Sequence, residues 1–389
     1  MHTAMRSGTA MRIGAAAVAA LAAAGIGAGT AAAAQDGDGS GPVRGIGPVV
    51  FAQTDALTGN QVVAYRRAED GRLTRLAAYD TGGLGGVLGG SVVDHLASQG
   101  SLTYDARHRL LYAVNAGSDT VSVFAVYGDL LQLRQVVRSG GDFPVSIAVH
   151  DDAVYVLNAL DGGSVQGFTV EDGRLCPQWG WHRALGLDPT ATPQFTNTPG
   201  QVGFADRGRK LVVTTKANGD DVDVFRLDDS GAPAAYPVVT HLPNAVPFSF
   251  VTDPDSGNLY LTEAGPNAVA SFRLEYDGTL TPLRTVATGQ SATCWITRIG
   301  DLLFASNAGS ATVSIYRTDQ DGSLRALGTA PTNPGTVDSA ASRDGRFLYV
   351  QTGGQGVLDA FAVRPDGTLT PIGTFPVPDA VGGQGIVAS

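Results

Sequence analysis

Short stretches of alternating apolar and polar residues recur along this chain in one form. Each stretch alternates, breaks at a polar turn rich in Gly, Asn or Asp, alternates again and ends on an aromatic residue. Alternation with period two predicts β-strands, and the polar break predicts a hairpin. The hairpin occurs seven times, at 50–65, 111–124, 154–168, 211–225, 259–272, 303–316 and 348–361.

Further strands flank each hairpin. An Asp-Gly-x-Leu turn, or a remnant of it, follows every copy and leads into one more strand, as in DGTLTPL (277–283) and DGTLTPI (366–372). A short strand such as PVSIAVH (144–150) precedes six of the seven hairpins. The repeating unit therefore has four strands, and its spacing of 43 to 61 residues is typical of a propeller blade.

The sequence thus predicts an all-β fold, a seven-bladed β-propeller with four-stranded blades. The first hairpin lacks a preceding strand, and the chain ends in GGQGIVAS (382–389). We expect this last segment to complete the first blade, so that the N- and C-terminal strands close the ring and leave no open sheet edge. The alternative, two unrelated β-sandwiches, would not explain seven copies of one unit.

Composition supports this prediction and excludes one class of partner. The chain has 389 residues, of which 43% are hydrophobic, 16% are charged and 52 are glycine, as expected for a β-rich protein with many tight turns. The net charge is −10, and no run of Lys or Arg occurs. Nucleic acid is not an expected partner, because phosphate binding needs clustered positive charge. We expect a monomer.

The first 34 residues have a different character. Arg6 and Arg12 precede a run of Ala and Gly with an A-x-A cleavage site near Ala32–Ala34, which predicts a secretory signal peptide over 1–34. A retained membrane anchor is the alternative, but Ala and Gly insert weakly. We therefore expect a secreted protein without stable membrane insertion, with a flexible lead-in at 35–47 and the propeller at 48–389. Cys176 and Cys294 could pair outside the cell, although nothing around them requires it.

The repeats also resemble a known family. LYAVNAGSDTVSVF (111–124) and VYVLNALDGGSVQGF (154–168), alternating with DGTLTPL and DGTLTPI, are similar to the lactonase family of seven-bladed propellers. That family includes the bacterial 6-phosphogluconolactonase and the fungal carboxymuconate lactonising enzyme, and surface-protein repeats of the Tyr-Val-Thr-Asn (YVTN) type are related to it. The resemblance covers roughly 48–389 and implies a propeller fold, with lactone hydrolysis as one possible activity.

The family's characteristic site residues are not matched. Where the family has Gly-Pro-Arg-His in the fourth blade, this chain has Thr198-Pro199-Gly200-Gln201, and where the family has Asn-Glu, it has Thr215-Lys216. Lactone opening needs a base that activates water and a cation for the developing oxyanion. Lys216 as the cation and Glu263 as the base are the candidates for a catalytic pair, and a structural ion pair between them is the alternative.

Aligning the copies gives two columns of polar residues. We expect the first column, at the start of the innermost strands, to surround the channel opening as a ligand-binding ring or as a ring that holds channel water. Its members are Ser101, Ser146, Gln201, Ser249, Cys294, Asp338 and Gln384. In the second column, at the end of the next strand, Asn and Thr are expected to bond the turn backbone, with Asn115 also a ligand-binding candidate. Its members are Thr54, Asn115, Asn158, Thr215, Glu263, Asn307 and Thr352.

Two insertions lead into innermost strands and should lie on the channel-mouth face. The first contains GGLGGVLGG (82–90), which lacks the Lys-Ser/Thr of a P-loop and is predicted to be a flexible rim loop. The second, at 176–197, contains Trp179 and Trp181, which could stack on a sugar or cover a blade end. Trp295 is expected to pack between blades.

Other chemistry is sparse. DPDSGN (253–258) is predicted to be a turn rather than a calcium loop, and the histidines show no metal-ligand spacing, so neither a metal nor a cofactor is expected. The leading functional prediction is a secreted propeller that binds a small molecule or carbohydrate at the channel mouth, either as a binding scaffold or as a divergent hydrolase. A true lactonase acting on a sugar lactone and a cell-surface interaction module are the alternatives.

Overall fold

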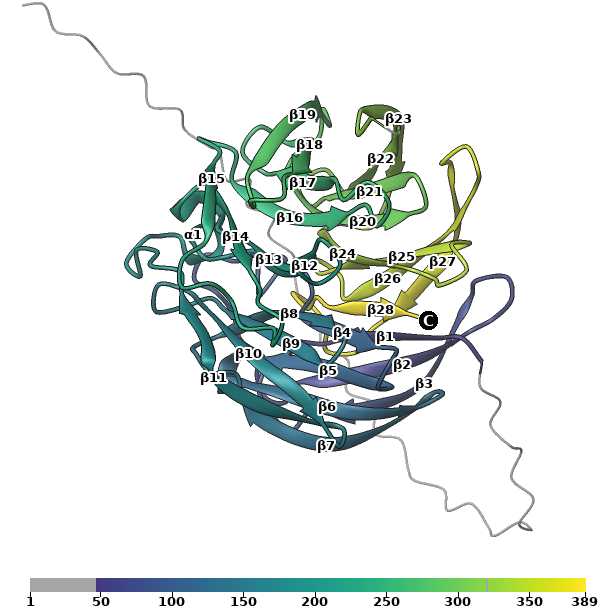
Figure 1. Cartoon of the computed structure of the whole chain (residues 1–389). Helices are drawn as coiled ribbons and strands as arrows, with labels where there is room; N and C mark the ends of the chain where they lie inside the picture. The colour runs from purple at the N-terminus through teal and green to yellow at the C-terminus, as the bar shows by residue number, and fades with distance from the viewer. Residues whose placement is uncertain (1–46, 320) are drawn as a thin grey trace, which may run out of the picture. The chain divides into compact units, whose positions relative to one another are not determined.

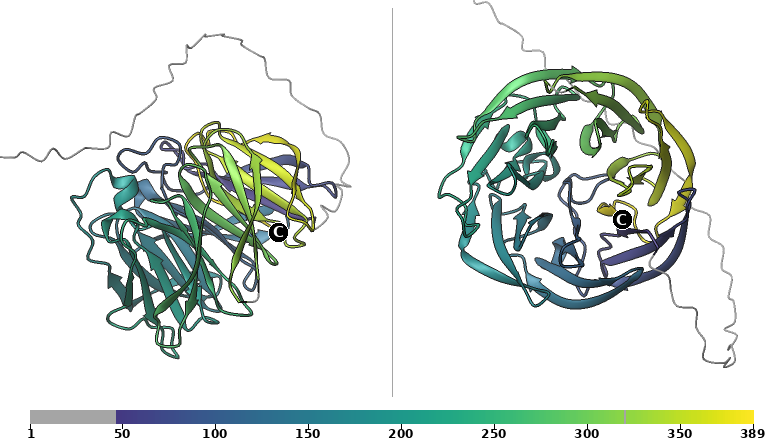
Figure 2. Two further views of the ribbon diagram at one scale, coloured as in Figure 1. Left: turned by 90° about the horizontal axis from the view of Figure 1, so that it is seen from above. Right: turned by 45° about the vertical axis from the view of Figure 1, so that its right-hand side comes forward.

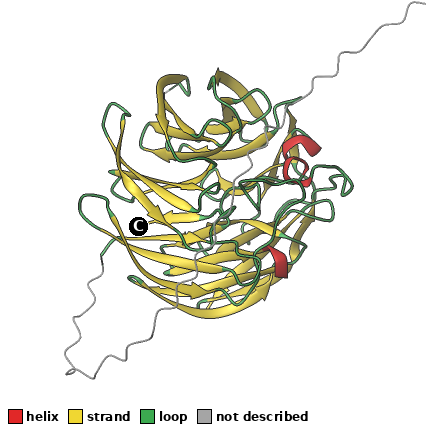
Figure 3. Ribbon diagram, turned by 180° about the vertical axis from the view of Figure 1, so that it is seen from behind, coloured by secondary structure: helices red, strands yellow, loops and turns green. Residues whose placement is uncertain are grey.

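The computed structural model describes residues 47–319 and 321–389, and nearly all of these residues belong to strands or the turns that join them (Figures 1 and 3). The predicted signal peptide and almost all of the lead-in lie outside the described residues. Helical structure is confined to α1 (Gln194–Asn197) and two 3-10 turns, η1 (Ala116–Ser118) and η2 (Lys216–Asn218). No helix in the described ranges is long and apolar enough to cross a membrane.

The strands form seven antiparallel sheets of four strands, arranged around a common axis (Figure 2). We number these sheets as blades 1 to 7. From the channel outwards, they contain β28 (Ile386–Ala388), β1 (Val49–Gln53), β2 (Gln61–Arg67) and β3 (Leu73–Asp80) in blade 1; β4 (Leu102–Asp105), β5 (Leu110–Asn115), β6 (Thr120–Tyr127) and β7 (Leu130–Arg138) in blade 2; β8 (Pro144–His150), β9 (Ala153–Asn158), β10 (Ser164–Glu171) and β11 (Arg174–Ala184) in blade 3; β12 (Gln201–Ala205), β13 (Lys210–Thr214), β14 (Asp221–Arg226) and β15 (Val238–His241) in blade 4; β16 (Pro247–Thr252), β17 (Leu259–Glu263), β18 (Ala268–Leu274) and β19 (Leu280–Ala287) in blade 5; β20 (Thr293–Ile299), β21 (Leu302–Asn307), β22 (Thr312–Thr318) and β23 (Leu324–Pro331) in blade 6; and β24 (Thr336–Ala341), β25 (Phe347–Thr352), β26 (Val357–Val363) and β27 (Leu369–Pro376) in blade 7.

The ring closes as predicted. The C-terminal strand β28 pairs with the N-terminal strand β1, with Val50 opposite Ala388 and Ala52 opposite Ile386. Ser389 adds a bond at the end of this pair, since its Oγ accepts the Val49 amide proton at 2.8 Å. The seven blades and the shared first blade are therefore confirmed, and the alternative of two sandwiches is wrong.

The second strand of each blade explains why the repeated hairpins are so apolar. Every residue of β5 and of β25 is buried, because a central strand of a blade is covered by neighbouring blades on both faces. The aromatic residues of these strands are the largest fully buried side chains. They include Tyr112, Tyr155, Tyr260 and Tyr349, all with zero relative exposure.

Two of these tyrosines, Tyr349 and Tyr155, bond to the Asp-Gly turn, or the remnant of it, in the following blade. Tyr349 of blade 7 donates its hydroxyl proton to the Gly71 carbonyl of blade 1 at 2.9 Å, and Tyr155 of blade 3 donates to the Gly231 carbonyl of blade 4 at 2.6 Å. Gly71 has a φ of 86°, and a β-carbon there would lie 2.5 Å from the Phe347 ring. A turn that both reverses the chain and touches the next blade therefore requires glycine at this position.

Candidate functional site

The first polar column joins neighbouring innermost strands instead of facing an open channel. Ser101 donates to the Gln384 carbonyl at 3.2 Å, and Ser249 donates to the Cys294 carbonyl at 2.5 Å. Ser146 donates to the Gln99 carbonyl at 2.6 Å. Most of the column is thus engaged in bonds between elements around the axis.

Asp338 is a junction within this column. Its carboxylate accepts a hydrogen bond from the Ser339 amide at 2.9 Å. It also accepts hydrogen bonds from the amides of Gly100, in the first insertion, and of Ile386, in the closing strand β28. Burial raises the pKa of Asp338 to about 7, and its hydrogen bonds oppose this shift. The geometry gives Asp338 a structural role in holding three chain segments together.

The first insertion fills the end of the channel where the innermost strands begin. Residues 88–100, which we call the channel plug, include Leu88, Leu96 and Ser98 with zero exposure and Ala97 with 2%. The flexible rim loop was predicted for 82–90, and that segment is packed as well, since Leu88 is buried and Gly85 and Gly86 lie in close contact with Asp55 and Phe143. Leu88 and Leu96 could have indicated from the sequence that this segment is buried, because leucine side chains are more stable in a core than in water.

The plug crosses the axis and is bonded to distant blades. The Gln99 amide donates to the Gly200 carbonyl of the blade 4 entry at 3.0 Å. The Gln99 side chain pairs with Ile296 of blade 6 like a strand neighbour, since its Nε2 donates to the Ile296 carbonyl and its Oε1 accepts the Ile296 amide proton, both at 2.9 Å. The Trp295 indole donates to the Ser98 carbonyl at 2.6 Å. These bonds hold the plug within the ring.

Lys216 fastens the plug to the second insertion. Its Nζ is buried and donates to the Ala97 and Phe195 carbonyls at 2.7 Å each and to Thr198 Oγ1 at 3.2 Å. Burial lowers the pKa of Lys216, and the nearby Asp94 carboxylate opposes this effect. An ammonium group has three protons, and all three are used here, so none is left for an oxyanion.

The second insertion lies directly on the plug. Gln194 Oε1 in α1 accepts the Gly89 amide proton at 2.7 Å, and α1 lies beside η2, which begins at Lys216 (Figure 3). Thr198–Gly200 and the Thr215-Lys216 pair, which occupy positions of the lactonase motifs, are therefore covered by the chain's own residues, whereas Gln201 is partly exposed. This end of the channel is closed.

Glu263 is the unusual member of the second column. It ends β17 with 8% exposure, and its carboxylate makes no hydrogen bond or ion pair within the described ranges. Burial raises its pKa. The ion pair with Lys216 considered as an alternative is therefore wrong. Cys294, on the neighbouring β20, and Cys176 are both free thiols, and burial raises the pKa of each.

The Asn and Thr members of the second column bond their own hairpins. Asn115 donates to Thr120 Oγ1 at 3.1 Å and to Ser122 Oγ at 2.8 Å. Asn307 makes the equivalent bonds to Thr312 and Ser314 at 3.1 and 2.9 Å. These contacts match the structural role that the sequence suggested, and they place Asn115 in the wall of the propeller rather than at an opening.

The other end of the channel is open. A recess of about 400 Å³, which we call the mouth recess, lies among the ends of the innermost strands of blades 4, 5 and 6. The plug residue Gln99 also borders it. The complete lining is Gln99, Gln201, Gly203, Phe204, Phe250, Val251, Thr252, Ile296, Thr297, Arg298 and Gly300.

The mouth recess combines apolar walls with a few oriented polar groups. Gln201 Oε1 accepts the Phe250 amide proton at 2.7 Å, and its amide NH₂ makes no bond within the described residues. Arg298 pairs with Asp253 at 3.2 Å. The partly exposed Phe204 supplies apolar surface, and Phe250 behind it is buried. Of these residues only Gln201 was predicted. Arg298 could have been noticed as the sole arginine on an innermost strand.

The tryptophans divide between packing and exposure. Trp181 is 8% exposed and stacks on Tyr155 with ring centroids 5.8 Å apart, so this residue of the outermost strand β11 packs between blades 3 and 4. Trp179 is 81% exposed. Trp295 packs edge-on against Phe248 of blade 5 at 4.9 Å, which confirms its position between blades. The described residues contain no cluster of His, Cys, Asp or Glu that could hold a metal ion.

Comparison with known proteins supports this architecture. The family described as "Lactonase, 7-bladed beta-propeller" matches residues 91–334. No protein with curated annotation matches the chain.

Solved structures with the same fold have low sequence identity to this chain. A putative 6-phosphogluconolactonase from Bacteroides fragilis has 19% identity, with a TM-score of 0.70 over 90% of this chain and 99% of its own. A second, from Bacteroides uniformis, has 18% identity, with a TM-score of 0.72 over 88% and 99%. The periplasmic gluconolactonase of Pseudomonas aeruginosa has 19% identity, with a TM-score of 0.69 over 88% and 98%. These likenesses establish the fold.

Proposed function

The chain belongs to the lactonase family of seven-bladed β-propellers, and on this premise we propose that it is an exported protein that binds a small, hydroxyl-rich molecule in the mouth recess. The observation that carries the proposal is the contrast between the two ends of the channel. The end that holds Thr198–Gly200 and Lys216 is filled by the plug and α1, while a recess of about 400 Å³, which Gln201 lines, stays open on the other side of the plug. That volume is typical of small-molecule sites.

The chemistry of the recess favours a sugar or a sugar lactone. The free NH₂ of Gln201 can donate to a hydroxyl or carbonyl oxygen, and the partly exposed Phe204 ring can pack against the C–H groups of a pyranose ring. Some solved structures with this fold carry the names of enzymes that act on sugar lactones. A neutral sugar and the corresponding aldonolactone are therefore the first ligands to test.

Binding of D-glucose and D-glucono-1,5-lactone, measured by isothermal titration calorimetry, tests the proposal. Gln201→Glu keeps the oxygen that accepts the Phe250 amide proton but removes the free donors, so we expect affinity to fall about five- to tenfold, as for loss of one neutral hydrogen bond. Gln132→Glu, at an exposed position on β7, adds the same charge and should bind like the wild type. Equal affinity in the two variants, or no binding by the wild type, would refute the proposal.

Hydrolysis of a lactone is the second candidate function, and Glu263 favours it. An acid that is 8% exposed, has no partner in the described residues and has a pKa raised by burial fits a general base. We expect any lactonase activity to rise with pH through the raised pKa and to be lost in Glu263→Gln. Hydrolysis that persists in that variant would exclude Glu263 as the base. In this scheme the oxyanion needs a cation other than Lys216.

A further inference from the structure

A second recess adjoins the mouth recess on the same face of the propeller. It has a volume of about 440 Å³ and lies between the β12–β13 turn of blade 4 and the β16–β17 turn of blade 5, with one residue from blade 3. We call it the rim recess. Its lining is His150, Phe204, Ala205, Asp206, Arg207, Gly208, Arg209, Thr252, Asp253, Pro254, Asp255, Ser256 and Gly257.

The two recesses are adjacent. Phe204 and Thr252 line both of them. Arg298 of the mouth recess also forms its 3.2 Å ion pair with Asp253 of the rim recess, so this pair lies at their boundary. A ligand bound in the mouth recess can therefore extend over Phe204 into the rim recess without leaving the protein surface.

The rim recess has a preorganised aromatic wall. The His150 ring lies 5.5 Å from the Phe204 ring, centroid to centroid, at an angle of 39°. Gly208, with a φ of 81°, allows the His150 ring to approach the turn backbone so closely that a β-carbon would overlap it. Histidine and phenylalanine side by side offer a surface for a flat ring.

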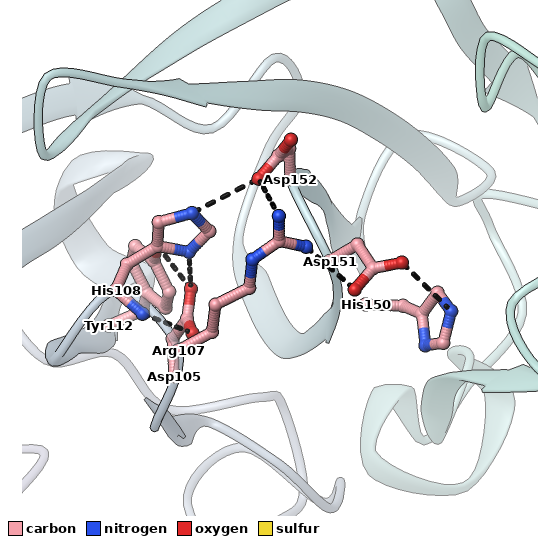
Figure 4. A network of polar contacts seen from close by, with 7 residues as sticks. All are labelled: Asp105, Arg107, His108, Tyr112, His150, Asp151 and Asp152. Atoms are coloured by element: carbon pink, nitrogen blue, oxygen red, sulfur yellow. Dashed lines mark hydrogen bonds and ion pairs between the residues drawn. The ribbon is translucent and has the colours of Figure 1, made fainter.

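A network of polar contacts fixes the chain that carries His150 (Figure 4). His150 Nε2 lies 3.7 Å from Asp151, whose carboxylate accepts a proton from Arg107 at 2.7 Å. His108 then contacts Asp105 and Asp152 through its two ring nitrogens, at 2.6 and 3.1 Å. The network joins the β4–β5 turn of blade 2 to the β8–β9 turn of blade 3, which directly follows His150.

The mouth recess and the rim recess together are lined by equal numbers of carboxylates and guanidinium groups. The carboxylates are Asp206, Asp253 and Asp255, and the guanidinium groups are Arg207, Arg209 and Arg298. Equal numbers of each disfavour a strongly charged ligand and supply both acceptors and donors for hydroxyl groups. Asp255 and Arg207 are exposed and make no side-chain ion pair within the described residues, so they remain available.

We propose that the rim recess is a second sugar subsite, so that the natural ligand is a neutral disaccharide or a longer saccharide that spans both recesses. This inference rests on the proposed binding function of the mouth recess. One ring would contact Gln201, and the next would pack on His150 and Phe204 with Asp255 accepting from its hydroxyls.

Calorimetric titration with D-glucose, cellobiose and maltose tests the second subsite. We expect at least one disaccharide to bind the full mature chain at least tenfold more tightly than glucose. His150→Ala and Asp255→Ala should reduce this ratio to about one, whereas Asp229→Asn, at an exposed position on blade 4, should leave every affinity unchanged. Gln201→Glu should weaken the binding of all three sugars.

The outcomes separate the two proposals. Binding of glucose without any gain for either disaccharide, or a gain that His150→Ala and Asp255→Ala both retain, would refute the second subsite and leave the binding function of the mouth recess intact. No binding of any of the three sugars would refute both. Thermal unfolding of each variant shows whether a lost affinity reflects a lost fold.

Discussion

At the scale of single residues, identity alone did not reveal what surrounds a side chain. Lys216 was conspicuous in the sequence because it stands where the lactonase motif has an acid, and a catalytic cation was a reasonable hypothesis. Its partners come from Ala97, which lies 119 positions away, and from Phe195 and Thr198 in another insertion. No periodicity or motif connects these segments, so only the folded chain shows that the ammonium is enclosed.

Lys216 should therefore matter for stability. Lys216→Met keeps the length of the side chain but leaves the Ala97 and Phe195 carbonyls without a donor, and we expect the free energy of unfolding to fall by about 2–4 kcal/mol. Chemical denaturation measures this change. Lys210→Met, which removes the other buried lysine and its ion pair with Asp206, provides a matched comparison outside the plug. An unchanged midpoint for Lys216→Met would contradict the structural role.

Asp223 on β14 predicts a pH dependence of stability. It is 5% exposed, and burial raises its pKa to about 7, so the folded protein holds a proton that the unfolded chain has already lost above pH 4. The contribution of Asp223 to the free energy of unfolding is therefore most favourable at low pH, and it is lost as the pH rises towards 7. The advantage of Asp223→Asn over the wild type should grow by about 2 kcal/mol between pH 5 and pH 7 and then stay constant. An advantage that does not change with pH would contradict a buried, protonated Asp223.

At the scale of elements, the strands were predictable and the plug was not. Alternation with period two and repeated Asp-Gly turns identify the hairpins, because burial of a central strand on both faces imposes one pattern on every copy. The plug lacks a repeating pattern and a regular backbone, and its bonds are to residues such as Gly200 and Ile296 in other blades. Contacts between residues so far apart in the sequence leave no local pattern from which they could be predicted.

The Asp-Gly turn provides a test at this scale. Gly71→Ala should destabilise the protein by about 1–3 kcal/mol, because its φ of 86° strains an alanine and the new β-carbon would meet Phe347 at 2.5 Å. Gly59→Ala, in a turn with no atom within 4 Å of the new β-carbon, should be neutral or slightly stabilising. Similar melting temperatures for the two variants would show that contact with the next blade is unimportant.

At the scale of the whole molecule, the ring depends on closure and the site depends on which end of the channel is open. The seven repeats and the unpaired first hairpin were enough to predict the closing strand β28. Most residues of the two polar columns lie at the end that the plug fills, and Gln201 is the column member that lines the open recess, together with residues from the far ends of β16 and β20. The repeated units do not show which end of the channel is open, because the plug that closes one end is an insertion and not part of the repeat.

Closure is testable by truncation. Removal of residues 382–389 deletes β28 and exposes the inner edge of β1, so we expect loss of cooperative unfolding or aggregation of the shortened chain. Adding the missing octapeptide in trans at high concentration should restore part of the stability. A truncated chain that unfolds at the same temperature as the full chain would show that the closing strand contributes little.

The location of a bound sugar tests the central claim most directly. A crystal structure of the mature protein soaked with cellobiose should show a pyranose ring in the mouth recess, with a hydroxyl within hydrogen-bond distance of the Gln201 amide and the second ring against His150. Density for the sugar at the opposite end, beside Glu263 and with the plug displaced, would contradict the account.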